Sequence, residues 1–271
     1  MSVLTKITEH VYWMPPGLPD RPSVCGVVGD RRTLMLDAGS SKAHTRAFLD
    51  ALWGETATRP SAVVYTHSHW DHVFGGAELG GLVIAHALTA EELIELAAMD
   101  WTDEGIEQRV ASGRASQQHA ANVKEELPSP RTVEVAPADI VFQDGLHIEL
   151  GGVAVRLRHV GGNHSADSSV MYVEPDRVLF LGDCMCDSPA GALTAELAFP
   201  LHAAILEFDA ELYVEGHGAS VLSRSEIEGL IEKMRLAEEV AREGSAIAEP
   251  DEDTEEFVQA FRAGRATASL S

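Results

Sequence analysis

The chain has 271 residues, of which 45% are hydrophobic and 23% are charged, a composition typical of a folded globular protein rather than a disordered or collagen-like one. Its formal net charge of −23 disfavours nucleic acid and membrane surfaces as partners, since both repel an acidic protein. Three cysteines, no apolar run of bilayer length and no N-terminal signal pattern predict a cytoplasmic protein without a disulfide framework.

Short apolar runs alternate with helical patterns along the chain. This alternation occurs in two successive rounds along the chain. The pattern of the first round predicts strands at 10–14, 23–29, 33–39, 61–68 and 81–87, with a helix at 41–54. A segment at about 89–127, rich in Ala, Glu and Gln, is predicted to be a helical insertion. The second round predicts strands from 132 to 183 and at 211–216, and helices near 192–208, at 224–243 and near 253–263.

Two such rounds, one ending near residue 87 and one beginning near 132, indicate two β-sheets packed face to face. Helices would cover both outer faces, which gives an α/β fold of the four-layer αββα sandwich type. We expect residues 1–271 to form a single domain, because no low-complexity linker divides the chain.

Three histidines and an aspartate fall within residues 67–72, at the end of the strand predicted at 61–68. On an extended chain His67 and His69 project to the same side, so both can bind one metal ion. Asp71 and His72 are adjacent and diverge, which suits a second ion. Imidazole and carboxylate ligands favour zinc first and iron or manganese next. The alternative is a polar loop that caps a helix.

Further ligands must come from elsewhere, because this loop cannot complete two coordination shells. Three candidates follow predicted apolar strands, and each has a glycine nearby that allows close backbone approach: His164, Asp183 and His217.

This arrangement resembles the metallo-β-lactamase-fold hydrolases, whose motif order is matched from Asp37 in LMLDAG to His217 in EGHG. The resemblance implies one metal ion on His67, His69 and His164. It implies a second ion on Asp71, His72 and His217, with Asp183 bridging the two. It also implies that Asp37 supports the histidine loop. A histidine at position 69, rather than a glutamate, favours the dizinc hydrolases over the di-iron oxidoreductases of this fold.

Two Zn²⁺ ions of this kind share a hydroxide nucleophile, and Asp71 and Asp183 are the expected catalytic carboxylates, with Asp71 orienting the nucleophile and shuttling its proton. The predicted function is therefore hydrolysis of a small ester, lactone, thioester or amide. A β-lactamase proper, an iron-dependent oxidoreductase resembling sulfur dioxygenases, and a noncatalytic metal-binding protein are the alternatives.

Four apolar side chains are candidates for the substrate wall: Trp70, Phe74, Met99 and Trp101. The last two lie in the insertion, which either forms a lid over the metals or serves as a packing or homodimer element. Cys184 and Cys186 follow Asp183, but a small buried residue is the commoner role of a free cysteine.

Overall fold

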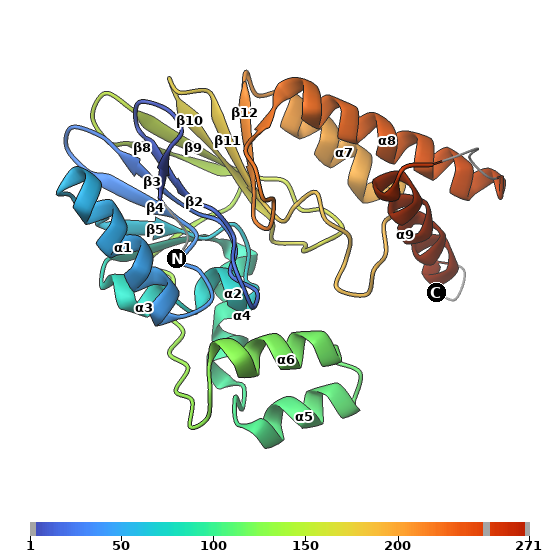
Figure 1. The fold of residues 1–271 in the computed structure, drawn as a ribbon, viewed down its shortest axis with the longest axis horizontal. Coiled ribbons are helices and arrows are strands. Elements are labelled where there is room, and N and C mark those ends of the chain that lie inside the picture. The colour runs from blue at the N-terminus through green and yellow to red at the C-terminus, as the bar shows by residue number, and fades with distance from the viewer. Residues whose placement is uncertain (1–3, 246–249, 269–271) are drawn as a thin grey trace.

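The computed structural model describes residues 4–245 and 250–268. Two mixed β-sheets lie face to face, with helices on the outer side of each (Figure 1). The structure thus confirms the four-layer αββα sandwich predicted from the alternation of strands and helices.

The strands of the first sheet follow one another in chain order. They are β1 (Thr5–Lys6), β2 (Val11–Met14), β3 (Val24–Val28), β4 (Thr33–Leu36), β5 (Ala62–Val64), β6 (Leu82–His86) and β7 (Ile140–Phe142). Strands β1 to β4 pair antiparallel, and β4 to β7 pair parallel. Because β7 joins this sheet after the insertion, the first round ends at residue 142 and not near 87. Residues 132–138, expected to be extended, have no regular secondary structure.

The second sheet has the order β13-β12-β11-β10-β9-β8. Its strands are β8 (Gly145–Glu149), β9 (Ala154–His159), β10 (Ser169–Glu174), β11 (Val178–Gly182), β12 (Leu212–Glu215) and β13 (Leu222–Ser223). Only β11 and β12 run parallel to each other among these neighbours. Short edge strands such as β1 and β13 were not predicted, since two residues carry no periodicity.

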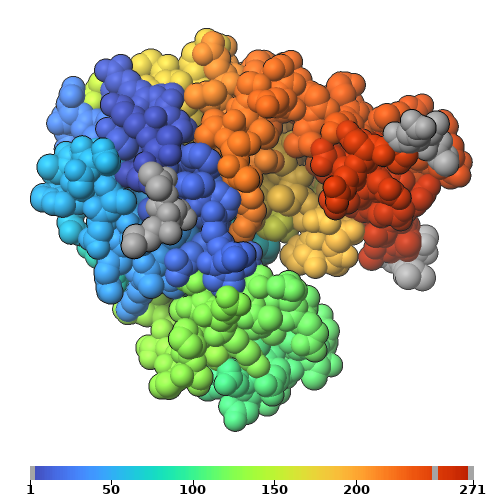
Figure 2. All heavy atoms as spheres, in the orientation of Figure 1, coloured from blue at the N-terminus to red at the C-terminus, as the bar shows by residue number. Residues whose placement is uncertain are grey.

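Apart from the one-turn helices α2 (Trp70–Val73) and α3 (Gly76–Leu79), the helices divide into three groups. Helix α1 (Lys42–Thr56) covers the first sheet, and α7 (Ala195–Leu206), α8 (Arg224–Glu243) and α9 (Glu252–Ala268) lie beside the second sheet (Figure 1). The predicted insertion consists of α4 (Ala87–Ala98), α5 (Asp103–Ala111) and α6 (Gln117–Glu126). The surface is hollowed between the α5–α6 pair and the C-terminal helices (Figure 2). No helix in the described ranges is long and apolar enough to cross a membrane.

The observed C-terminal end of α1 lies two residues beyond the predicted one. Gly54 was expected to end α1, but the helix continues to Thr56, whose hydroxyl donates to the Leu52 carbonyl at 2.7 Å. Ala57 then takes the left-handed conformation at the C-cap, with φ 54°. Ser41 caps the other end, accepting from the His44 amide.

The core has three apolar layers. The middle one lies between the sheets and includes Val27, Leu36, Val173 and Phe180, all nearly or fully buried. The outer two pack each sheet against its helices. The sheets are therefore rigidly held, and the loops that leave β5, β9, β11 and β12 carry the polar residues predicted to bind metal, while Asp37 follows β4.

Candidate metal centre

The histidine loop begins where β5 gives way to a short turn of helix. Helix α2 (Trp70–Val73) has His69 as its N-cap residue, so Asp71 and His72 lie within its first turn. This short helix was not predicted. The expectation that the adjacent Asp71 and His72 would diverge is wrong, because this helical turn brings both side chains into one donor group, with His72 Nε2 3.3 Å from Asp71 Oδ2.

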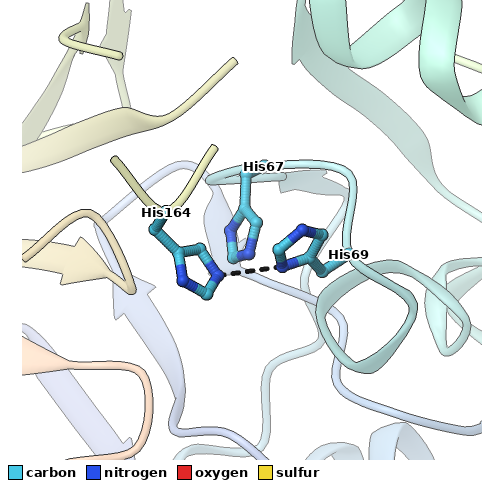
Figure 3. Close-up of side chains that lie close together, drawn as sticks. All are labelled: His67, His69 and His164. Atoms are coloured by element: carbon cyan, nitrogen blue, oxygen red, sulfur yellow. Dashed lines mark hydrogen bonds between the residues drawn. The ribbon is translucent and has the colours of Figure 1, made fainter. Parts of the chain in front are cut away.

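The first group of donors consists of three imidazoles, from His67, His69 and His164. Their rings surround a common point, with centroids 4.5, 4.6 and 5.0 Å apart. His164 Nε2 lies 2.9 Å from His69 Nδ1 (Figure 3). The Nδ1 atom of His164 lies 3.0 Å from the carbonyl oxygen of Asp187; a proton on Nδ1 would be donated there, leaving Nε2 free to bind a metal ion.

The second group consists of Asp71, His72, Asp183 and His217. The Nε2 atom of His72 lies 3.3 Å from Asp71 Oδ2 and 3.2 Å from Asp183 Oδ2. The Nε2 atom of His217 lies 3.1 Å and 3.5 Å from the same two oxygens. In each group the candidate donor atoms all lie within 4.8 Å of one another.

Asp183 connects the two groups. Its Oδ2 atom lies 3.5 Å from His164 Nε2 of the first group and 3.2 Å from His72 Nε2 of the second. The structure therefore brings together all seven residues that the sequence predicted as ligands, and it puts Asp183 where a bridging carboxylate would be.

Asp37 supports both groups from behind. Its carboxylate accepts hydrogen bonds from the Thr66 amide at 2.7 Å, from Thr66 Oγ1 at 2.8 Å and from His72 Nδ1 at 2.7 Å. Since the Thr66 hydroxyl donates to Asp37, it accepts from His67 Nδ1, 2.9 Å away. These bonds place the proton on Nδ1 of both histidines and direct each Nε2 toward the donor groups.

The residues present fit metal ions. Among the described residues, the buried atoms His67 Nε2 and Asp183 Oδ1 have no hydrogen-bond partner, although such atoms are rarely left unpaired. Gly216 leaves room for this carboxylate, because a Cβ atom there would collide with Asp183 Oδ1 and approach His72 Cε1 to 3.1 Å. Three nitrogens in one group and mixed nitrogen and oxygen donors in the other are ligand sets that zinc accepts.

The two groups differ in their protonation. Burial, reinforced by neighbouring imidazoles, lowers the pKa of His69 to about 4 and that of His67 well below its usual range. In the second group burial also acts to lower the histidine pKa values, but the Asp183 and Asp71 carboxylates outweigh it and raise the pKa of His217 to about 10. The first group thus offers neutral nitrogens, and the second holds protons that a cation would displace.

The sequence model of the metallo-beta-lactamase superfamily matches residues 18–240. The chain belongs to this superfamily. Members of the metallo-beta-lactamase superfamily are mostly hydrolases and typically bind metal ions, which agrees with the two donor groups. Among curated proteins, none matches the chain.

Several solved structures share the fold. A metallo-beta-lactamase from Pontibacter korlensis is 18% identical with a TM-score of 0.60, covering 86% of this chain and 98% of its own. A beta-lactamase domain protein from Burkholderia ambifaria is 17% identical with a TM-score of 0.65, covering 98% and 86%. A stereoselective inverting sec-alkylsulfatase from Pseudomonas sp. is 16% identical with a TM-score of 0.67, covering 95% of this chain but only 47% of the sulfatase.

Three of the four apolar residues predicted to line the substrate site, Trp70, Phe74 and Trp101, lie in the first sheet's outer core. Trp70 is buried, with its ring 6.0 Å from that of Phe74. Trp101 packs edge-on against Phe74 at 4.8 Å and donates from Nε1 to the Leu96 carbonyl at 3.0 Å. Met99 follows α4 and is 38% exposed. A substrate contact by any of the four stays a prediction.

Three polar residues near the centre were not singled out from the sequence. His119 on α6 contacts the Trp70 ring edge-on at 6.0 Å, and burial lowers its pKa. Asp20, in the loop between β2 and β3, lies with Oδ1 3.8 Å from His217 Nδ1. Asn122 on α6 donates to Asp20 Oδ2 at 2.8 Å. The insertion therefore reaches the metal centre through polar side chains.

Neither cysteine belongs to a donor group. Cys184 is buried in the apolar layer between the second sheet and its helices, and Cys186 is exposed. Both thiols lie outside the two sets of residues whose donor atoms converge, which agrees with the packing role expected for Cys184.

Proposed function

We propose that the protein is a dinuclear zinc-dependent hydrolase of a small ester, lactone, thioester or amide. The observation that carries this proposal is the pair of donor groups that share Asp183, with His67 Nε2 and Asp183 Oδ1 buried and unpartnered among the described residues. Superfamily membership supports the reaction class. Zinc is favoured because the first group is made of imidazoles alone.

When bound, the two ions supply an activated water and an electrophilic partner for the substrate's carbonyl oxygen. Asp71 provides the base. Burial alone would raise the pKa of Asp71, but the charge of His72 and the hydrogen bond from His217 hold it below its usual range. The carboxylate is therefore ionised at neutral pH, so it can accept a hydrogen bond from the attacking water and then take up its proton.

Asp183 and Asp37 position the candidate metal ligands. Asp183 holds the two donor groups together through Oδ2, and Asp37 fixes the ring orientation of His72. A rigid set of this kind keeps the reacting groups in place without reorganisation during the reaction.

The test is hydrolysis of a panel comprising p-nitrophenyl acetate, an aliphatic lactone, a thioester and a chromogenic cephalosporin. We expect turnover of at least one of the first three, loss of that turnover with dipicolinic acid, and recovery on adding zinc. Turnover that resists the chelator would overturn the proposal. Preferential cleavage of the cephalosporin would favour a β-lactamase, and oxygen consumption by an iron-loaded protein would favour an oxidoreductase.

A further inference from the structure

The surroundings of the metal centre are acidic beyond what the candidate ligands require. Asp37, Asp71 and Asp183 already offset much of the charge that two divalent ions would bring. Three further acidic residues lie close to the candidate ligands in space or along the chain: Asp20, Asp187 and Glu215. Asp20 faces His217, Asp187 accepts from His164 through its main chain, and Glu215 directly precedes Gly216, which lies against Asp183.

Asp20 is fixed in place rather than free on the surface. Asn122 donates to its Oδ2 atom at 2.8 Å, and Gln118 donates to Asn122 Oδ1 at 2.7 Å. Both amides come from α6, so the insertion holds this carboxylate beside the candidate ligand His217. A side chain oriented by two successive hydrogen bonds contributes a charge of defined position.

The basic side chains of this region are paired with other acids. Arg21, next to Asp20, donates from Nε to both carboxylate oxygens of Glu126, at 3.1 and 2.9 Å. On the insertion, Lys124 pairs with Glu107 and, on the segment that follows it, Arg131 pairs with Asp103. In the described ranges, no lysine or arginine forms an ion pair with Asp20, Asp71, Asp183, Asp187 or Glu215.

We infer that the substrate of this site carries an uncharged or positively charged group beside its scissile bond, and that Asp20 sets this preference. The inference rests on the proposed hydrolase function and narrows its substrate class. A carboxylate, sulfate or phosphate on the substrate would meet the Asp20 carboxylate, which among the described residues pairs with the imidazole of the candidate ligand His217 and with no lysine or arginine that could bind the anion. An ammonium group would be attracted to Asp20. The interaction energies of like and of opposite charges a few ångströms apart differ measurably even near a protein surface.

The test uses three ligands that bind zinc through the same hydroxamate but differ in charge: acetohydroxamic acid, glycine hydroxamate and succinic acid monohydroxamate. Their dissociation constants are measured by titration calorimetry on the zinc-loaded full chain. We expect the glycine and acetyl compounds to bind roughly three- to thirtyfold more tightly than the succinyl compound, the range expected for one unit charge at about 7 Å.

The variant Asp20→Asn keeps an oxygen that accepts from Asn122 but removes the charge. It should therefore reduce the difference in dissociation constant between the succinyl compound and the other two hydroxamates, at unchanged zinc stoichiometry. Asp50→Asn on α1, an exposed acid, is the control with the same change in net charge, and it should leave the difference intact. The kcat/KM values of neutral and succinyl p-nitrophenyl esters should follow the same order.

Tightest binding of the succinyl compound, or an unchanged preference in Asp20→Asn, would overturn the inference while leaving the hydrolase proposal standing. Failure of all three hydroxamates to bind the zinc-loaded protein would contradict the metal centre itself, and the inference with it.

Discussion

Asp37 Oδ2 lies 2.7 Å from His72 Nδ1, and both side chains are fully buried. The same carboxylate accepts from Thr66, whose hydroxyl accepts in turn from His67. One residue thus orients a candidate ligand in each donor group. Asp37 has φ 56°, a left-handed conformation that aspartate and asparagine tolerate better than most residues, so asparagine can replace it without added backbone strain.

Replacing Asp37 with Asn should therefore weaken both metal sites. The carboxylate accepts three hydrogen bonds on two oxygens, whereas an amide has one acceptor oxygen and an NH2 group that cannot accept from Thr66 or His72. We expect zinc affinity to fall roughly ten- to a hundredfold at each site. Thr66→Val removes the hydroxyl that links Asp37 to His67 but leaves the hydrogen bond between Asp37 and His72 in place, so it should weaken the first site more than the second. Competition with a chromogenic chelator measures both constants. Equal effects of the two variants on both sites would contradict the arrangement described here.

Replacing Gly216 with Ala should remove metal, because the added methyl group collides with Asp183 Oδ1 and crowds His72. We expect less than half of the wild-type zinc content at equal loading. Gly54→Ala in α1 is the matched control, since its Cβ meets no atom within 4 Å. It should keep full zinc content and stabilise the helix by about 0.5–1 kcal/mol. Wild-type zinc content in Gly216→Ala would show that this carboxylate does not bind metal.

Two residues of the insertion should separate packing from substrate contact. Trp101 is buried against Phe74, so Trp101→Ala should lower the free energy of unfolding by about 3–5 kcal/mol. His119 is half-buried and meets Trp70 at the edge of the centre, so His119→Ala should raise KM roughly fivefold at unchanged zinc content. Urea unfolding measures the change in the free energy of unfolding, and steady-state kinetics measures the change in KM. A KM effect in Trp101→Ala alone would assign substrate contact to Trp101 instead.

A pH-dependent contribution to stability is expected at Asp176, far from the metal centre. Its buried carboxylate accepts from the Thr8 hydroxyl, the His10 amide and His10 Nδ1. Burial would raise the pKa of Asp176, but these hydrogen bonds hold it below its usual range. The contribution is therefore complete above the unfolded-state pKa of about 3.9 and is lost as the pH falls through the lower folded-state value.

Asp176→Asn should accordingly destabilise the protein by about 1–3 kcal/mol at pH 7. The difference from wild type should shrink progressively below about pH 4. Urea titrations across this range measure it, and a difference that stays constant down to pH 2.5 would show that the charge of Asp176 is not responsible.

Much of the metal centre could be predicted because its residues follow strong local patterns. The histidine loop stands at the exit of a buried strand, and Asp37, Asp183 and His217 follow strands as well. Strands of a sandwich end at shared edges, so side chains distant in sequence meet there. The periodicity of α8 predicted its bounds, 224–243, without error.

The remaining features depend on contacts that leave no local pattern. The hydrogen bond between Asp20 and Asn122 joins residues separated by 102 positions, and neither has neighbours of a recognisable motif. Strand β7 belongs to the first sheet because its three residues pair with β6, from which the insertion separates them in sequence. A stretch of apolar residues cannot indicate which of two sheets it will join.

In the proposed enzyme two metal ions act together in one site. Titrating the metal-free protein with zinc, while following bound metal and ester hydrolysis in the same samples, tests this cooperation. We predict that two equivalents bind and that most of the activity appears with the second. Full activity at one equivalent, or binding that stops at one, would show that a dinuclear centre is not required.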